Sequence, residues 1–113
     1  MTTDKTGAQT TVSAANGKYT IAVDGETVGL AAVADHDNQR VFYHTEVDER
    51  FGGRGLANIL VGEALEATRA DGKRVVALCP MVGAFVKKHP EFSDITDPVT
   101  PEILRWADTL QAQ

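Results

Sequence analysis

Residues that would indicate a disulfide-linked, membrane-spanning or nucleic-acid-binding protein are scarce in this sequence of 113 residues. Its single cysteine, Cys79, cannot form an intramolecular disulfide and fits a reducing cytoplasm. No apolar run approaches the ~20 residues that a bilayer span requires, and the N-terminus has no apolar signal region. We therefore expect a cytoplasmic protein with no membrane contact. Lys and Arg number 11 against 16 Asp and Glu, and the formal charge of −5 disfavours nucleic acid as a partner.

Metal ligands are also sparse. His36, His44, His89 and the cysteine lack the paired spacing of zinc sites, so we expect no bound metal. The sequence does contain 42% hydrophobic and 24% charged residues, which is the composition of one soluble globular domain. We expect this domain to span residues 16–113. Residues 1–15 are rich in Thr, Ala and other small residues, which favours a flexible N-terminal tail, either free or joining the sheet near its end.

Alternating apolar and polar residues predict three strands in the first half of the domain, at about 18–24, 27–34 and 40–47. Asp24-Gly25 separates the first two strands. This pair supplies the positive φ angles of a tight hairpin turn, so the strands are expected to be antiparallel.

Helical spacing dominates the second half. Apolar residues recur every three to four positions over 56–70, which predicts an amphipathic helix, and Gly72 suits its C-terminal end. The apolar run 75–78 predicts a buried strand, and the helix before it is long enough to cross over and make it parallel to the third strand. Shorter helices are expected over 80–88 and 101–111. This order predicts an α+β fold with a mixed, mostly antiparallel sheet.

Between the third strand and the first helix lies the loop 50–55, with the sequence Arg-Phe-Gly-Gly-Arg-Gly. Glycines let the backbone approach a ligand, successive N–H groups can point at phosphate oxygens, and the helix adds the positive end of its dipole. Arg50 and Arg54 supply cations for charge-assisted contacts. The loop is not a P-loop, which needs Gly-Lys-Ser/Thr, and the dinucleotide fingerprint needs a small residue where Asn58 stands. We therefore predict a different kind of anion site.

The loop and its flanks resemble the GNAT superfamily of acetyltransferases, whose pyrophosphate signature Gln/Arg-x-x-Gly-x-Gly/Ala lies between a strand and a helix. Further motifs are similar to a small single-domain GNAT-like family: His44-Thr45-x-Val47, Gly53-Arg54-Gly55-Leu56-Ala57, Cys79-Pro80-x-Val82 and His89-Pro90-Glu91-Phe92. This resemblance implies a truncated GNAT fold. In that fold the strands on either side of the crossover helix splay apart, and the pantetheine arm of acetyl-CoA enters the gap.

The resemblance also implies which residues hold acetyl-CoA. The backbone of Val47 is expected to pair with the pantetheine amides. Lys87 and Lys88 are expected to meet the nucleotide end, although a solvated helix end explains these two lysines at least as well. The pyrophosphate is expected on the loop and the first turn of the following helix, at Arg50, Gly52, Gly53, Arg54, Gly55, Leu56 and Ala57.

The acid of the reaction is not the usual one. Larger GNAT enzymes commonly use a tyrosine on the helix after the fourth strand, and that position here falls near Lys87 with no tyrosine close by. Cys79 is the best substitute, because it ends the buried strand and precedes Pro80, the expected first residue of a helix whose dipole favours a thiolate. Cys79 is expected to act as acid, base or acetyl acceptor. The alternative is a buried core thiol.

His44 and Glu46 are the other catalytic candidates. Strict alternation along the third strand places both on one face together with Phe42. Histidine titrates near neutral pH and can deprotonate an incoming ammonium group, or it can fix a loop by hydrogen bonding. Glu46 resembles the carboxylate base that some GNAT enzymes place on this strand, and its alternative is an exposed strand charge.

The resemblance implies an N-acetyltransferase that moves an acetyl group from acetyl-CoA to an unidentified amine in a ternary complex. The acceptor is either a small molecule or a peptide or protein amine, and the acidic net charge is compatible with a cationic one. Two alternatives stay open. They are a CoA-binding regulatory or interaction module, favoured by the missing tyrosine, and an acyl-carrying or redox protein centred on Cys79. The helix with Trp106 suits core or dimer contact, so we expect a monomer or a weak homodimer.

Overall fold

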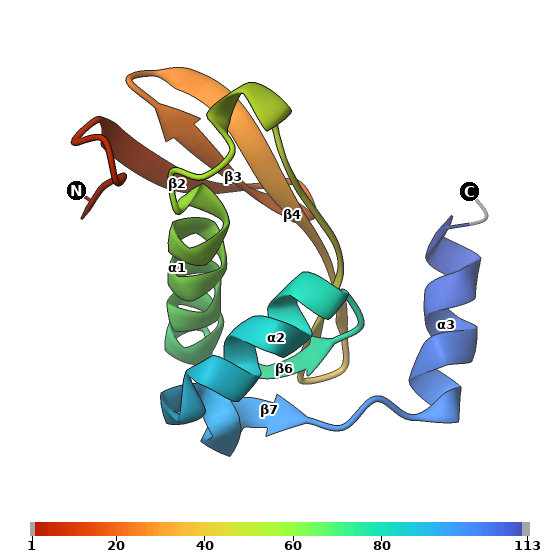
Figure 1. Ribbon diagram of the computed structural model, residues 1–113. Coiled ribbons are helices and arrows are strands. Elements are labelled where there is room, and N and C mark those ends of the chain that lie inside the picture. Colours follow the sequence, from red (N-terminus) through yellow and green to blue (C-terminus); the bar gives the residue numbers. More distant parts are fainter. Residues whose placement is uncertain (1, 112–113) are drawn as a thin grey trace.

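The structure, a computed structural model, describes residues 2–111 and contains a seven-stranded sheet. The strands lie in the sheet in chain order: β1 (Thr2–Thr3), β2 (Gln9–Ala15), β3 (Lys18–Val23), β4 (Glu26–His36), β5 (Gln39–Val47), β6 (Arg74–Ala77) and β7 (Thr96–Asp97). The helices are α1 (Leu56–Ala70), α2 (Pro80–Lys88) and α3 (Pro101–Gln111), with short 3-10 turns η1 (Glu49–Phe51) and η2 (Pro90–Ile95). Pairing is antiparallel from β1 to β5 and parallel from β5 through β6 to β7. The predicted α+β fold with a mixed, mostly antiparallel sheet is confirmed, with α1 and α2 on one face and α3 on the other (Figure 1).

The N-terminal residues do not form the tail that was expected over 1–15. Residues Gln9–Ala15 are strand β2, whose register with β3 runs from Thr10↔Val23 to Ala15↔Lys18. A flexible tail is therefore wrong for residues 9–15, whereas the alternative that the end of this segment joins the sheet agrees with the structure. The Thr, Ser and Ala residues of this stretch alternate too weakly in hydrophobicity to indicate a strand, and pairing with β3 supplies the order that local sequence does not.

The hairpin between β3 and β4 is confirmed. Asp24 and Gly25 have φ angles of 47° and 89°, the positive values that a tight turn of this kind needs. Because the turn is short, it holds β3 and β4 in register, and their buried side chains meet on the face that α1 covers.

A bulge in β5 changes which side chains share a face. Val33 of β4 pairs with Phe42, whereas the preceding Ala32 pairs with His44, so Tyr43 is an extra residue on β5. One inserted residue moves every following side chain to the other face. His44 and Glu46 therefore lie on the face opposite to Phe42, and the prediction that the three share a face is wrong.

Helix α1 spans the predicted range because its apolar side chains form one stripe along the helix. Its buried residues are Leu56, Leu60, Val61, Ala64, Leu65 and Thr68. The Thr68 hydroxyl donates to the Ala64 carbonyl at 2.8 Å, which satisfies the one polar group in the stripe. Gly72 follows the helix with a φ of 71°, and the next strand, β6, runs parallel to β5 as predicted. Within residues 2–111, no helix is long and apolar enough to cross a membrane.

Two apolar clusters lie on the two faces of the sheet. The larger joins the sheet to α1 and α2 and includes Phe42 and Phe85. The smaller joins Val41 and Val76 of the sheet to Ile103 of α3, with Trp106 packed against it. Helix α3 therefore contributes to the core, which was one of the two roles expected for it.

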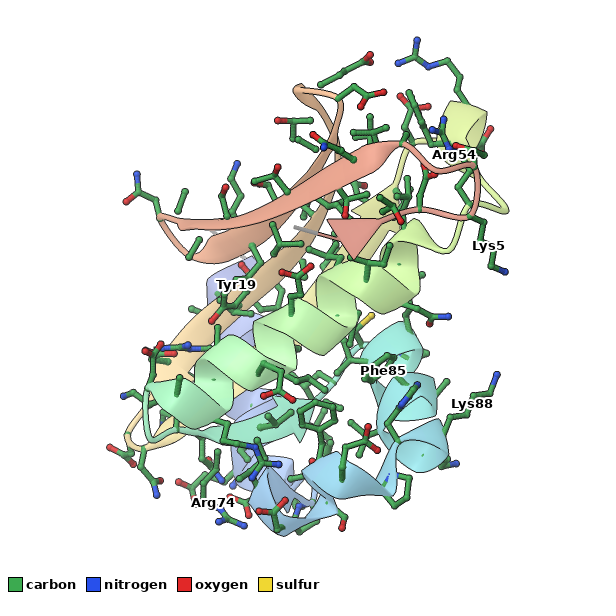
Figure 2. All side chains as sticks on the ribbon, turned by 90° about the vertical axis from the view of Figure 1, so that its left-hand side faces the viewer. Lys5, Tyr19, Arg54, Arg74, Phe85 and Lys88 are labelled. Carbon is green, nitrogen blue, oxygen red and sulfur yellow. The ribbon has the colours of Figure 1, made fainter. Side chains whose placement is uncertain are left out.

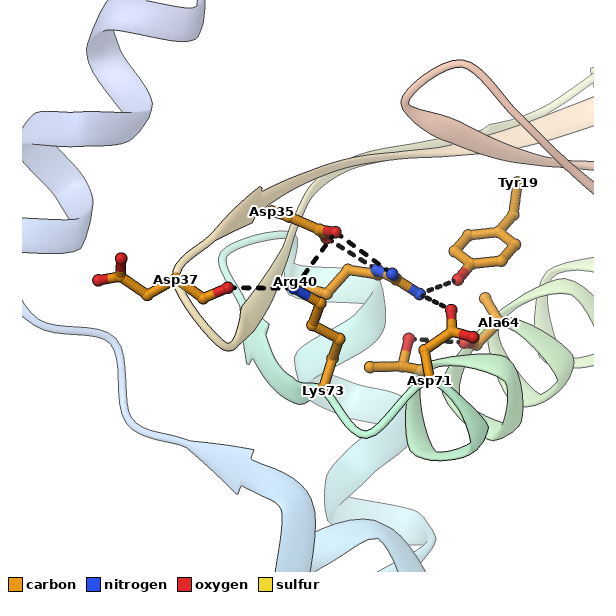
Figure 3. Close-up of polar contacts among 8 residues, drawn as sticks. Tyr19, Asp35, Asp37, Arg40, Ala64, Asp71 and Lys73 are labelled. Carbon is orange, nitrogen blue, oxygen red and sulfur yellow. Dashed lines mark hydrogen bonds and ion pairs between the residues drawn. The ribbon is translucent and has the colours of Figure 1, made fainter.

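Arg40 ties the tip of the β4–β5 hairpin to the end of α1 (Figure 3). Its guanidinium donates to Asp35 at 2.8 Å, to the Tyr19 hydroxyl at 2.6 Å and to Asp71 at 2.8 Å. Only 12% of the Arg40 side chain is exposed. The hydrogen bond to Asp35 is the main reason that the pKa of Arg40 is raised above its usual value, and the same bond lowers the pKa of Asp35. Lys73 adds a hydrogen bond to the Asp37 carbonyl at 3.1 Å.

Candidate active site

Strands β5 and β6 are paired along only part of β5. Their parallel register ends at Phe42↔Ala77. There the N–H groups of Leu78 and Cys79 both donate to the Phe42 carbonyl, each at 3.0 Å. Residues 43–47 continue β5. Residues 44–47 pair with β4 on one side, but no strand of the described chain pairs with this stretch on the other. The splayed gap expected from the resemblance is therefore present, with Phe42 at its closed end.

The glycine-rich loop 50–55 begins where β5 ends. The Asp48 carboxylate accepts a hydrogen bond from the Arg50 N–H at 2.9 Å and caps the turn η1. Gly53 and Gly55 then have φ angles of 77° and 78°, which glycine adopts without steric cost. Gly55 is the N-cap of α1, so the glycines determine how the chain enters the helix.

Successive backbone N–H groups at the start of α1 are free. The first hydrogen bond of the helix runs from the Ile59 N–H to the Gly55 carbonyl at 3.2 Å. The N–H groups of residues 53–58 donate to no other residue between 2 and 111. Gly52 differs, since its N–H donates to the Glu49 carbonyl at 3.1 Å. The free groups and the positive end of the α1 dipole together suit an anion.

Both loop arginines are held by carboxylates. The Arg50 guanidinium contacts Asp48 at 2.9 Å and Glu26 at 3.2 Å, and its side chain is 71% exposed. Arg54 donates to Asp4 at 2.7 Å and is only 23% exposed. Arg50 therefore needs only to exchange surface partners to reach a ligand, whereas Arg54 is fixed within the protein.

Cys79 lies where β6 ends and α2 begins, as predicted. It is the N-cap of α2, Pro80 is the first helical residue, and the Cys79 carbonyl accepts from the Gly83 N–H at 3.0 Å. Its side chain packs in the larger apolar cluster on the α1 side, and the residue is 7% exposed. Its place at the closed end of the gap suits catalysis, while its burial is also what a core thiol would show.

The structure places His44 and Glu46 together but apart from the thiol. His44 Nε2 and Glu46 Oε2 are 3.3 Å apart, and the two side chains are 58% and 62% exposed. Both lie on the face of the sheet opposite to α1, because of the bulge at Tyr43. Cys79 lies on the α1 side. The candidate residues therefore approach the gap from its two faces.

A groove of about 620 Å³ lies on the face that carries Glu46. It extends over β3, β4 and the end of β5 to the turn η1. The charged residues lining it are Lys18 and three acids, Glu46, Asp48 and Glu49. The hydrogen bond from the Arg50 side chain lowers the pKa of Asp48, which keeps that carboxylate ionised. A groove with this balance of charge suits a cationic ligand.

Thr45 was not given a role from the sequence, although it belongs to one of the quoted motifs. Its hydroxyl is buried and has no hydrogen-bond partner in the described part of the protein. Thr45 pairs with Ala31 and so faces the same side as Phe42, on the stretch of β5 that β6 leaves unpaired. A buried polar group without a partner costs roughly 1–3 kcal/mol, so the Thr45 hydroxyl is available to bond a ligand or a water molecule that enters the gap. Sequence alternation carries no signal for a missing partner.

The remaining expected cofactor residues are less constrained. Val47 pairs with Gly29 of β4 and packs against the larger cluster. Leu56 is buried and fixes the start of α1, next to the half-buried Ala57. Lys87 and Lys88 are exposed at the end of α2, and Lys88 extends outward in Figure 2.

Comparisons with known proteins agree with this arrangement. A family model described as GCN5-related N-acetyl-transferase matches residues 18–95. Among solved structures, a GCN5-like candidate N-acetyltransferase from Staphylococcus aureus, determined in solution by NMR, is similar with a TM-score of 0.62 and 18% identity, over 80% of this chain and 91% of that one. This likeness shows the fold, and no curated protein sequence matches significantly. Since the family model spans most of the sequence, the chain belongs to the GCN5-related N-acetyltransferase family.

Proposed function

We propose that this protein transfers the acetyl group of acetyl-CoA to a cationic amine. The observation that carries the proposal is the run of free N–H groups at 53–58 beside the open edge of β5 at 43–47. The N–H groups suit the pyrophosphate, and an open strand edge suits the amides of the pantetheine arm. A donor bound in this way would direct its thioester toward the closed end of the gap, where Phe42 and Cys79 meet.

The chemistry requires proton transfers at both nitrogen and sulfur. The amine nitrogen forms a bond to the carbonyl carbon, the C–S bond breaks, and CoA leaves as a thiolate. An ammonium acceptor loses one proton to become nucleophilic and a second after its nitrogen has bonded to the carbonyl carbon, and the thiolate gains one proton. We assign both nitrogen protons to the His44–Glu46 pair, which passes them to water, and the sulfur proton to the Cys79 thiol, which regains its proton from water. The buried Thr45 hydroxyl is free to donate to the carbonyl oxygen as negative charge develops there.

The acidic groove supports the assignment of a cationic acceptor. Glu46 lines the groove and also contacts His44, so an ammonium group bound there would lie beside its base. Glu49 adds negative charge along the same surface, and Asp48 also lines it, with its charge balanced by Arg50. A polyamine or a lysine-bearing peptide has the complementary charge.

An acceptor screen tests the proposal. Purified protein is incubated with acetyl-CoA and a panel of polyamines, lysine peptides and peptides with free N-termini, and released CoA thiol is measured. We expect release that depends on a cationic amine and falls when Glu46 is changed to Gln. Tight binding of CoA with no release by any amine in the panel would contradict turnover.

Two other functions are separated by intact-mass measurement after incubation with acetyl-CoA alone. One is an acyl-carrying protein, which the buried thiol at the end of the gap favours. Acetylation that is confined to Cys79 and is not passed to an amine would support it. If neither acetylation nor release occurs, the protein is a CoA-binding module.

A further inference from the structure

Residues 4–6, which precede the region matched by the family model, lie against the glycine-rich loop. The buried Asp4 carboxylate accepts hydrogen bonds from Arg54 Nε at 2.7 Å, from the Thr6 N–H at 2.8 Å and from the Thr6 hydroxyl at 2.7 Å. The Lys5 N–H donates to the Arg54 carbonyl at 3.0 Å. Both backbone and side chains therefore join this segment to the loop.

Lys5 is the residue of the segment that reaches the start of α1. A Cβ atom on Gly55 would lie 3.3 Å from Lys5 Cε and 3.5 Å from its Cγ. The methylene stem of Lys5 thus crosses the residue that caps the helix, and the ammonium nitrogen is one bond beyond Cε. Figure 2 shows Lys5 extending outward from the same end of the molecule as Arg54.

The ammonium of Lys5 differs from the nearby guanidinium groups because it is uncommitted. Lys5 is exposed, and no ion pair joins it to a residue of the described chain. Arg54 is bound to Asp4, and Arg50 is bound to Asp48 and Glu26. Lys5 is therefore the cation beside the free N–H groups that can bind a ligand without first breaking an ion pair.

We propose that Lys5 binds the pyrophosphate of CoA, and that Asp4, through Arg54, positions it. The proposal rests on the proposed function, since it needs CoA to bind at the loop. A phosphate held by the N–H groups of residues 53–58 would lie close to the Lys5 ammonium, which adds a charge-assisted contact. Glu49 precedes the loop in a protein of net charge −5, and Arg50 already balances the charge of Asp48, so a free cation offsets the remaining repulsion of a dianion.

The test compares the affinities of wild type and Lys5→Ala for CoA and for dephospho-CoA by isothermal titration calorimetry. Both probes contain the pyrophosphate, and dephospho-CoA lacks the 3′-phosphate. We expect Lys5→Ala to lower the affinity for both probes about tenfold, which is the effect of one lost charge-assisted contact. Lys5→Arg should keep most of the affinity. Arg105→Ala, which removes an exposed cation from α3 on the other face of the sheet, is the charge-matched control and should bind as wild type does.

The possible outcomes distinguish the role of Lys5 from the proposed binding of CoA at the loop. Equal affinity of wild type and Lys5→Ala for CoA would overturn the role of Lys5 while leaving CoA binding intact. A loss seen with CoA but not with dephospho-CoA would overturn the assignment to the pyrophosphate. Failure of the wild type to bind either probe would overturn the proposed function as well.

The positioning role of Asp4 has its own readout. In a double-mutant cycle, Asp4→Asn should weaken CoA binding, and adding Lys5→Ala to that variant should cost much less than about tenfold, because the segment that aims Lys5 is already released. Circular dichroism checks that each variant is folded. Fully additive losses would show that Asp4 does not position Lys5.

Discussion

The two ends of β5 differ in how they are held. At the Gln39 end the strand is paired on both sides, and Arg40 joins the hairpin tip to β3 and to the end of α1. At the Val47 end it is paired on one side, a buried hydroxyl has no partner, and a run of free N–H groups follows. At the first end the charged groups of Arg40, Asp35 and Asp71 are paired within the protein, and the one buried side-chain polar atom without a partner in the described chain is Nδ1 of His36. The second end leaves a whole run of backbone N–H groups and a hydroxyl for a ligand. Substitutions near the Gln39 end are therefore expected to change stability, and substitutions near the Val47 end to change ligand binding.

The largest effect, on the rate of turnover, is expected at Cys79, whose N–H donates to Phe42 midway along β5. Cys79→Ala should lower kcat on the order of 10³-fold if the thiol protonates the leaving group, the usual size of a lost acid or base. Affinity for CoA should change little, since the thiol is not at the loop. Titration calorimetry and steady-state rates with the best amine measure the two quantities. Full activity of Cys79→Ala would return the residue to the core.

A change at the loop should weaken CoA binding, while its cost in stability, roughly 1–2 kcal/mol for a side chain at a positive φ angle, should be shared by a matched control elsewhere. Gly53→Val places a branched side chain at a φ of 77°, which displaces the N–H groups and should weaken CoA binding about 100-fold. Gly72→Val is the matched control, because Gly72 has a φ of 71° and, like Gly53, open space around it, but lies at the other end of α1. Equal loss of CoA affinity in both variants would remove the loop from the site.

A change at the Gln39 end of β5 should lower stability and leave CoA binding unaltered. Arg40→Ala leaves Asp35, Asp71 and the Tyr19 hydroxyl without their shared partner, and should lower the free energy of unfolding by about 2 kcal/mol. CoA affinity of the folded protein should stay unchanged. Chemical denaturation and calorimetry check the two statements. A large loss of CoA affinity in this variant would mean that the two ends are not independent.

The smallest effect concerns the attachment of the N-terminal segment to the loop. Hydrogen bonds, first of all from the Thr6 hydroxyl, lower the pKa of Asp4 from 3.8 to about 2. A lowered pKa in the folded state adds stability that is complete above pH 3.8 and is lost as the pH falls toward 2. The difference in unfolding free energy between wild type and Asp4→Asn should therefore be constant near neutral pH and shrink below about pH 4. A difference that stays flat down to pH 3 would contradict this assignment.

Local signals made much of this arrangement predictable. The range of α1 follows from its apolar stripe and the glycine after it, and the loop follows from glycines whose φ angles only glycine adopts readily. Cys79 was placed at a helix N-cap because proline follows it. Each of these features depends on residues that are neighbours in the sequence.

The features that were missed depend on residues far apart in the chain. The bulge at Tyr43 exists only in the pairing of β5 with β4, and without it His44 and Glu46 are assigned to the wrong face. Strand β2 is ordered by β3, and the role of Asp4 depends on Arg54. Pairing partners of this kind are set by the fold, so alternation and composition do not reveal them.

Strand β2 also determines how much of the chain is needed for a protein that does not aggregate. A version trimmed to the matched region 18–95 would lack β2 and turn β3 into an edge strand. Its backbone N–H and C=O groups would then be a template for pairing with a second copy, the usual start of aggregation. A domain boundary taken from the matched region would thus cut through the folded sheet, because strand β2 protects the edge of β3.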